Sequence, residues 1–318
     1  MRFEPAVYEH AAGLIGATPW QASRDPDLLF EAHATAWRRY RHRPVTVGID
    51  LYNVEPEAFG AVIAPPDGLA MPSVSAPIAD TCAALLDLPV LDPARSGRFP
   101  MLLDTATRLA RTLPDAAVVM PVAGPFSMAA NLIGLENLLC ETMVEPETVR
   151  AALNALVEKQ ASILRAAAER GLGISIFESA ATPPMLSPDA FVETEIPALA
   201  ALVRAAAQAT GQPVACVLGG NTAPVLEPLL GIGADALICP CETDQAGFLK
   251  VAAACPDVAI RVNMQSSIVA RGDWPAIRAE LDRVVALAAT HPNACVGAGA
   301  IPYETVPETV QAMIEHVR

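Results

Sequence analysis

Short apolar segments alternate with longer helical stretches along most of this chain, and several of these segments end in polar or glycine-rich residues. Seven of them have the length and composition of strands: residues 45–50, 118–123, 174–177, 214–218, 237–238, 260–264 and 295–300. Strands that alternate with helices predict parallel βαβ units. We place an eighth strand within residues 61–92. The pattern then predicts an α/β protein built as a single (β/α)8 TIM-type barrel, with its reactive groups at the C-terminal strand ends.

Two further segments are predicted around this barrel. Residues 1–43 predict an N-terminal helical extension, whose main helix runs from about residue 25 to residue 41 after the capping residue Ser23. Residues 60–95 are rich in Pro, Gly, Asp and Ser, and they predict an excursion over the barrel mouth with a hairpin and a short helix. No linker or low-complexity tract divides the chain, so residues 1–318 are predicted to form one domain.

Composition narrows the classes of partner. The chain carries a formal net charge of −14, which argues against nucleic acid and anionic membranes as partners. The first residues lack the apolar core of a signal peptide, and no uncharged apolar run approaches the ~20 residues of a membrane span. The seven cysteines are irregularly spaced and mostly set in apolar segments, which indicates reduced thiols and a cytoplasmic location.

Four polar residues cluster at the end of the first predicted strand: Asp50, Asn53, Glu55 and Glu57. Carboxylates crowded at a barrel mouth can act as general acid or base, or ligate a cation, and crowding raises the pKa of at least one of them. The alternative interpretation is a helix or turn N-terminus, where Asn and Glu side chains cap backbone amides.

Two later strand ends carry further candidates. Glu178 and Ser179 follow the strand at 174–177, where an acid can act on a substrate or simply orient a neighbouring loop. Gly219-Gly220-Asn221-Thr222 follows the strand at 214–218. Consecutive glycines permit close approach of a ligand to the backbone, and amides at a helix start attract anions. A double glycine is also an ordinary tight turn.

The last two strands carry a cation, an amide and a phenol. Arg261 and Asn263 occupy alternate positions of one strand, so they share one face. An arginine inside a barrel is costly unless paired. Its partner is therefore a barrel carboxylate or a carboxylate or phosphate of the substrate. Tyr303 follows the last strand, where its phenol can donate a hydrogen bond to a substrate oxygen or pack within the loop.

Metal-ligand patterns are weak in this sequence. Cys239-Pro240-Cys241-Glu242, with Cys216 on the preceding strand, could bind a soft metal. The competing interpretation is two buried thiols and one exposed thiol. All five histidines lie in or beside predicted helices and none at a strand end, which disfavours a histidine-ligated metal or a catalytic imidazole. The sequence therefore predicts no metal ligands, and Asp50, Glu178, Asn221, Glu242 and Tyr303 are expected to line one mouth of one barrel.

The order and spacing of six segments resemble the uroporphyrinogen decarboxylase superfamily over nearly the full length. The likeness is closer to its corrinoid methyltransferase branch, typified by methylcobamide:coenzyme M methyltransferases. The segments are Gly48–Gly60, Gly124–Ala129, Phe177–Ser179, Leu186–Pro188, Gly219–Thr222 and Gly297–Pro302. The resemblance implies a (β/α)8 barrel with a deep cleft at the C-terminal strand ends, large enough for a tetrapyrrole or a corrinoid.

Two departures from the family pattern change what the resemblance implies. The methyltransferases hold zinc with His-x-Cys at one strand end and a later Cys, whereas the corresponding residues here are Val217, Gly219 and Ala298. None of these side chains has a nitrogen, sulfur or oxygen donor. The Arg-rich signature with which the decarboxylases clamp substrate carboxylates is also missing from residues 1–44, where the arginines at 38–41 fall on a predicted helix.

Three functional hypotheses follow. The first is a zinc-independent, methyltransferase-like enzyme acting on a methyl-corrinoid or a small methylated substrate, with Asp50, Glu55, Glu178 and Tyr303 as catalytic groups. It would bind no cofactor tightly, and the corrinoid would be a substrate or be carried by a partner corrinoid protein. The second is a carboxy-lyase acting on a polycarboxylate, with Arg261 as the clamp. The third is a non-catalytic tetrapyrrole- or corrinoid-binding protein.

Overall fold

Eight parallel strands form one curled sheet at the centre of the computed structural model, which describes residues 1–318. Along the sheet the strands follow the order β1-β10-β9-β8-β7-β6-β5-β2. They are β1 (Phe3–Ala6), β2 (Val45–Thr46), β5 (Val118–Ala123), β6 (Gly173–Phe177), β7 (Ala215–Val217), β8 (Ala236–Cys239), β9 (Ala259–Met264) and β10 (Ala294–Ala300). The predicted α/β barrel of the TIM type is confirmed, as are all seven strands located in the sequence.

The position of the eighth strand differs from the prediction. It is β1, which pairs in parallel with β10 and has all four residues buried, and it does not lie within residues 61–92. A glutamate and a proline at its centre concealed this strand, because neither residue is typical of a buried strand. The N-terminal extension is therefore helical only after the strand.

The excursion over the barrel mouth is confirmed. It contains an antiparallel hairpin of β3 (Val62–Ala64) and β4 (Ser73–Ala76), followed by a short 3₁₀ helix at Cys82–Leu85. The loop that joins the two strands reaches the mouth, where Met71 and Pro72 line the cavity described below.

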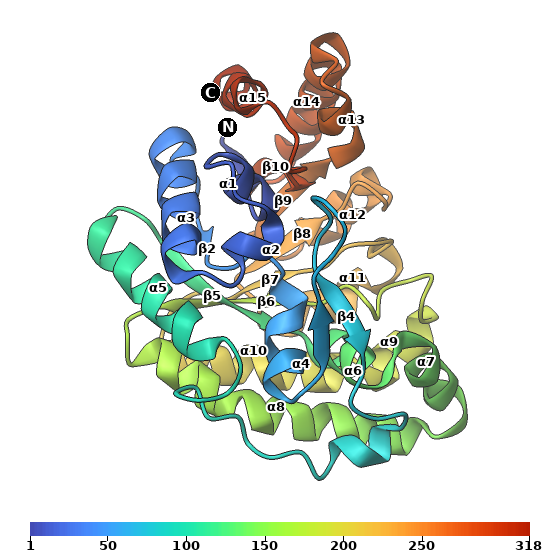
Figure 1. Ribbon diagram of the computed structural model, residues 1–318. Coiled ribbons are helices and arrows are strands. Elements are labelled where there is room, and N and C mark those ends of the chain that lie inside the picture. The colour runs from blue at the N-terminus through green and yellow to red at the C-terminus, as the bar shows by residue number, and fades with distance from the viewer.

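Helices surround the sheet on its outer side (Figure 1). The long helix of the N-terminal extension is α3 (Pro26–Tyr40), close to the predicted range. Its first turn is capped by Asp25, whose carboxylate accepts hydrogen bonds from two backbone amides. Beyond α3, the other helices of the first half are α1 (Glu9–Gly13), α2 (Pro19–Ala22), α4 (Val54–Ala58), α5 (Phe99–Thr112), α6 (Pro125–Ile133), α7 (Leu135–Val144) and α8 (Pro146–Ala168). The second half contributes α9 (Pro188–Thr194), α10 (Ile196–Thr210), α11 (Leu226–Leu230), α12 (Gln245–Ala252), α13 (Ser266–Arg271), α14 (Trp274–Ala288) and α15 (Pro307–Val317).

Packing between the helices and the outer face of the sheet produces one hydrophobic cluster of 85 buried residues. Alanine is frequent in this cluster, and its small side chain lets helices approach the sheet closely. No helix is both long and apolar enough to cross a membrane.

The two end strands, β1 and β2, share no backbone pairing, so side chains hold this seam of the barrel. The Glu4 carboxylate of β1 accepts a hydrogen bond of 2.7 Å from the backbone N–H of Arg43, two residues before β2. The same carboxylate forms an ion pair with Arg2. Burial raises the pKa of Glu4, and the bond from the Arg43 amide counteracts this.

We expect Glu4→Ala to lower the free energy of unfolding by about 1–3 kcal/mol, because the partly buried Arg43 amide then loses its acceptor and Arg2 loses its ion pair. Glu4→Gln should cost less, since the amide oxygen can still accept that bond. Denaturant titration measures both, with Glu31→Ala as the control because Glu31 is in an exposed pair with Arg38. A loss for Glu4→Ala no larger than for the control would show that the seam does not depend on this carboxylate.

Candidate functional site

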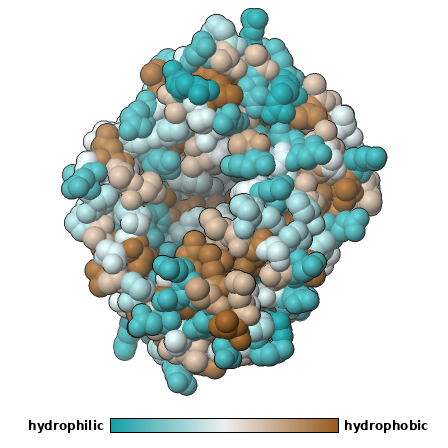
Figure 2. All heavy atoms as spheres, turned by 90° about the vertical axis from the view of Figure 1, so that its right-hand side faces the viewer, coloured by the Kyte–Doolittle hydropathy of each residue, from teal (hydrophilic) through white to brown (hydrophobic).

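A cavity of about 420 Å³ occupies the barrel mouth at the C-terminal strand ends. Figure 2 shows one face of the molecule hollowed near its centre, with hydrophilic and hydrophobic residues around the rim. Seven of the residues predicted from the sequence line the mouth cavity: Asp50, Asn53, Ser179, Gly219, Glu242, Arg261 and Asn263. The other seven do not, namely Glu55, Glu57, Glu178, Gly220, Asn221, Thr222 and Tyr303.

Asp50 is the centre of an ion-pair network on one wall of the mouth. Its two carboxylate oxygens each accept a hydrogen bond of 2.8 Å from Arg98, and its side chain is only 1% exposed. Arg98 also pairs with Glu57 of α4, and Arg24 lies 3.2 Å from Glu57. Burial disfavours the Arg98 cation, but the two carboxylates outweigh burial and raise its pKa. The negative charges of Asp50 and Glu57 are thus offset by the positive charges of Arg98 and Arg24. Glu57 itself does not line the mouth cavity.

Glu55 is fully buried, which corrects its expected place at the mouth. Its Oε1 accepts a hydrogen bond of 2.8 Å from the backbone N–H of Ala123, at the end of β5. Burial raises its pKa to about 7. The sequence pattern located this acid next to the strand end, but the helical turn of α4 directs it behind the mouth wall.

Glu178 is also fully buried and points away from the mouth cavity. Its carboxylate accepts a hydrogen bond of 2.6 Å from the Ser127 hydroxyl and another of 3.0 Å from the Ser127 backbone N–H. A side chain at Gly124 would collide with this carboxylate, so Gly124 and Ser127 together form its binding pocket. Burial raises the pKa of Glu178, and raises that of neighbouring Glu195 well above its usual range, where the charge of Glu178 adds to the effect. Glu178 therefore orders the backbone at the end of β6.

Tyr303 and Asn221 are likewise bound to protein groups outside the mouth. The Tyr303 hydroxyl donates a hydrogen bond of 3.1 Å to the carbonyl of Ala17. The Asn221 side-chain oxygen accepts a bond of 2.9 Å from the hydroxyl of Thr243. Of the five residues expected to form one ring around the mouth, only Asp50 and Glu242 line it.

The adjoining residues of the same turn are also placed by packing. Gly220 has a φ of 77° and lies against Thr182, which leaves no room for a side chain. Thr222 is buried, with only 1% of its surface exposed. Gly219 is the one residue of this turn that reaches the mouth cavity.

Arg261 projects into the barrel from β9 without an acidic partner. Its Nε donates a hydrogen bond of 3.1 Å to Asn263, and it forms no salt bridge with any carboxylate. Its aliphatic stem crosses the neighbouring strand at Gly297, where an added Cβ would lie 2.7 Å from Arg261 Cδ. Glycine at that position therefore allows the cation to lie across the floor of the mouth.

Several residues that line the mouth cavity were not predicted from the sequence. Tyr8 and Glu9 lie just beyond β1, the strand that the sequence did not predict at this position, and both line the mouth cavity. Burial raises the pKa of Tyr8 to about 12 and also raises the pKa of Glu9. The alternation of Glu4, Ala6 and Tyr8 along one face was the signal that could have revealed them.

Tyr52 is a further residue that sequence reasoning missed. Its hydroxyl lies 2.7 Å from the Ser179 hydroxyl, and its ring meets Phe177 edge-on with centroids 6.2 Å apart. Beyond this contact a second groove of about 540 Å³ continues the cleft, and Tyr52, Asn53 and Ser179 line both hollows. The Tyr52–Ser179 bridge therefore divides the mouth from the outer groove.

The residues at the family's zinc positions do not fit a zinc ion. Val217, Gly219 and Ala298 supply no donor side chain, and nowhere do three His, Cys, Asp or Glu side chains converge as a metal site would require. Burial raises the pKa values of Cys239 and Cys241 to about 12, which favours the thiol over the metal-binding thiolate.

We expect the purified protein to contain far less than one zinc ion per chain, because the donor set is missing. Elemental analysis after dialysis measures this directly. A value near one zinc per chain would contradict the expectation and would make Cys216, Cys239 and Cys241 relocated ligands.

A second expectation concerns the pH dependence of stability. The pKa of Glu55 is raised to about 7 in the folded state, so the fold binds a proton that the unfolded chain has already released. Its contribution to stability is therefore fully present below a pH of about 4.5 and is lost as the pH rises through about 7, on the order of 3 kcal/mol in total. Glu55→Gln should remove this loss, and denaturant titration across that range, with Glu31→Gln as the control, measures it. Parallel curves for wild type and Glu55→Gln would refute it.

Comparisons with known proteins agree with this geometry. A family profile described as uroporphyrinogen decarboxylase (URO-D) matches residues 6–318. Among solved structures, a methyltransferase from Methanosarcina mazei has a similar fold, with a TM-score of 0.83 at 20% sequence identity, covering 99% of this chain and 91% of that chain. A search of curated proteins finds no match. Because the family profile spans nearly the whole barrel, the chain belongs to the uroporphyrinogen decarboxylase family.

Proposed function

We propose that this protein is an enzyme that transfers a methyl group between a small anionic substrate, bound in the barrel mouth, and a corrinoid. No zinc ion takes part in activating the substrate. The support is membership of the uroporphyrinogen decarboxylase family, a fold like that of a protein named a methyltransferase, and the chemistry of the mouth.

Arg261 is the observation that carries the proposal. It is the cation on the floor of the mouth, and it has no carboxylate partner, whereas Arg98 and Arg24 on the wall are paired with Asp50 and Glu57. An unpaired arginine in a cavity is costly, and a carboxylate or phosphate offers its planar fork two parallel hydrogen bonds. One free cation matches a substrate with one anionic group better than a polycarboxylate.

The size of the mouth agrees with a small substrate. Its volume of about 420 Å³ falls in the range of roughly 300–1,000 Å³ typical of sites for small molecules. A corrinoid, free or carried by a partner protein, would therefore approach from outside, where the groove beyond Tyr52 and Ser179 extends the cleft. The protein itself would hold no cofactor tightly.

Glu9 supplies the proton that such a transfer requires. In the direction of demethylation, the bond between the methyl carbon and a heteroatom of the substrate breaks, and the methyl group passes to the reduced corrinoid. The heteroatom keeps the electron pair and takes a proton. Burial raises the pKa of Glu9, so its carboxyl group retains a proton to higher pH than an exposed glutamate. General acid catalysis of this kind contributes about 10²–10⁴-fold.

A carboxy-lyase is the second candidate, favoured by the same two residues. Arg261 would hold a carboxylate, and Glu9 would protonate the carbon from which carbon dioxide departs. A binding protein without turnover is the third. Product analysis separates them, since methylation of a corrinoid changes its absorption spectrum and decarboxylation releases carbon dioxide.

We expect Arg261→Met to lower kcat/KM for methyl transfer by about 10- to 150-fold, the equivalent of a lost hydrogen bond to a charged group of about 1.5–3 kcal/mol. Arg261→Lys should fall between that variant and the wild type, because it keeps the charge and loses the fork. Arg204→Met, on an exposed site of α10, is the matched control.

The assay follows corrinoid absorbance with a panel of methylated carboxylates and phosphates. An Arg261→Met variant with the KM and kcat of the wild type would overturn the anion site. Release of carbon dioxide without corrinoid methylation would favour the lyase, and ligand binding without either product would favour the binding protein.

A further inference from the structure

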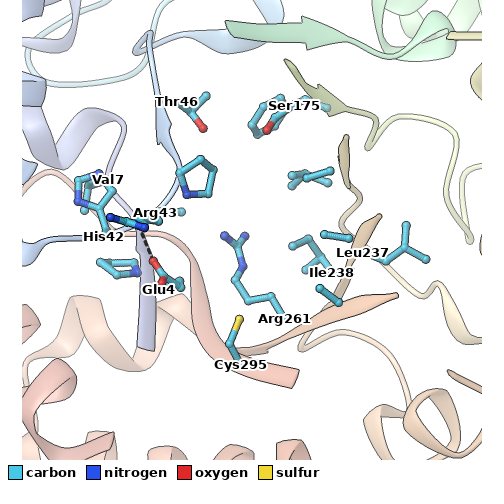
Figure 3. A pocket seen from close by; sticks show the side chains of 18 of the residues that line it. Glu4, Val7, His42, Arg43, Thr46, Ser175, Leu237, Ile238, Arg261 and Cys295 are labelled. Atoms are coloured by element: carbon cyan, nitrogen blue, oxygen red, sulfur yellow. Dashed lines mark hydrogen bonds between the residues drawn. The ribbon is translucent and has the colours of Figure 1, made fainter. Parts of the chain in front are cut away.

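A second, smaller cavity of about 150 Å³ lies inside the barrel below the mouth. Figure 3 shows its walls, with Arg261 pointing in from β9, Thr46 and Ser175 on another side, and Glu4 directed to Arg43. The lower cavity adjoins the mouth cavity, because six residues line both: Ala6, Tyr8, Phe177, Val217, Ile238 and Arg261. Arg261 thus stands at the boundary between the two.

Small side chains in one layer of the sheet create the lower cavity. Ser175 pairs with Ala215, Ala215 with Ala236, and Ala236 with Ala259, so these four lie side by side across β6, β7, β8 and β9. In barrels of this type such a layer is normally filled by Val, Ile and Leu. An unfilled cavity costs stability in proportion to its volume. The small layer therefore indicates space kept for a ligand.

The polar groups of the lower cavity point to the same conclusion. Glu4 accepts a hydrogen bond from the Arg43 backbone amide and forms its ion pair with Arg2, so it makes no salt bridge with Arg261. The charge of Arg261 acts on Glu4 over a longer distance, where it counteracts the rise in the Glu4 pKa. On the wall formed by the β1–β2 seam, His42 is only 3% exposed and its Nδ1 has no hydrogen-bond partner. A substrate whose apolar part carries one polar atom at this wall would give that nitrogen a partner.

We propose that the lower cavity binds a compact apolar part of the substrate, while Arg261 binds its anionic group and the methylated group stays in the mouth. This inference rests on the proposed function. Arg261 lies between the two cavities, so the three parts diverge from one point. The substrate class is then a carboxylate branched at the carbon next to the carboxyl group. A cavity of about 150 Å³ accommodates a body of about the size of a benzene ring.

Three probe molecules separate the contributions of the anionic group and of the apolar ring to binding. Phenylacetate has both, acetate lacks the ring, and phenylacetamide lacks the charge. Thermal shift and isothermal titration calorimetry on the purified full-length protein should show binding of phenylacetate. Acetate should bind at least about tenfold more weakly, and phenylacetamide should give no shift at concentrations that saturate with phenylacetate.

Two variants fill the lower cavity from neighbouring strands, Ala236→Leu and Ala215→Leu. Each should reduce phenylacetate affinity to that of acetate and leave acetate affinity unchanged. Ala151→Leu, at an exposed site of α8, is the control for an added leucine. The melting temperature of each unliganded variant establishes that it folds, and two independent variants guard against a local defect in one of them.

The outcomes distinguish this inference from the proposed function. Unchanged phenylacetate binding in both filled variants overturns the lower cavity as a binding compartment and leaves the Arg261 site intact. Phenylacetate binding that survives in Arg261→Met overturns the anion site, and with it the proposed function. Equal affinities for phenylacetate and acetate, or no binding of phenylacetate, also overturn the inference.

Discussion

The paired hydrogen bonds between Asp50 and Arg98 join segments that are distant in the sequence around one wall of the mouth. Arg98 precedes α5, Asp50 follows β2, and the Arg98 Nη1 that donates to Asp50 also donates a hydrogen bond to the carbonyl of Ser23 before α3. A buried pair of this kind is stable only when its remaining hydrogen-bond sites are filled, and removing one partner typically costs about 3–5 kcal/mol. Because Glu57 and Arg24 complete the network, the wall carries little uncompensated charge. Arg261 is the one basic side chain that lines the mouth, and it shares this lining with the carboxyl groups of Glu9 and Glu242.

Buried carboxyl groups fix the strand ends from behind this wall. Glu55 binds the backbone at the end of β5, and Glu178 binds Ser127 at the start of α6. Both acids belong to segments that resemble the family, yet their hydrogen bonds go to backbone and hydroxyl groups of the protein, and Glu55 Oε2 has no partner. Their effect on the site is positional, since they hold the strand ends from which Ser179 and Asn53 enter the mouth.

Much of the fold follows from the alternation of apolar strands and helices, and that pattern located seven of the eight strands. It failed for β1 because a glutamate and a proline are atypical of a buried strand, and one of the groups that hold the Glu4 carboxylate, the Arg43 amide, is 39 residues away in the sequence. The error carried over to the site, since Tyr8 and Glu9 lie beyond the strand that was missed.

Position at a strand end also does not determine where a side chain points. Glu178 and Ser179 are neighbours in sequence, but only Ser179 reaches the mouth. Seven of the predicted residues line the mouth because strand ends converge in this fold. The side chains or backbone of the other seven are held away from the mouth by contacts with neighbouring protein groups.

The contact between the hydroxyls of Tyr52 and Ser179 sets the size of the site. When the contact is closed, the mouth is limited to its own volume, and when it opens, the mouth and the outer groove are joined. One neutral hydrogen bond contributes about 0.5–1.5 kcal/mol, so its opening is a small thermal fluctuation unless the ring contact with Phe177 adds much to the cost. With this contact in place, the mouth and the outer groove are two separate hollows of about 420 and 540 Å³. In the molecules in which the contact is open, the two hollows would join into one cavity. A bulky ligand that needs both hollows binds only the molecules in which the contact is open. Its apparent affinity is therefore its intrinsic affinity multiplied by the fraction of molecules that are open.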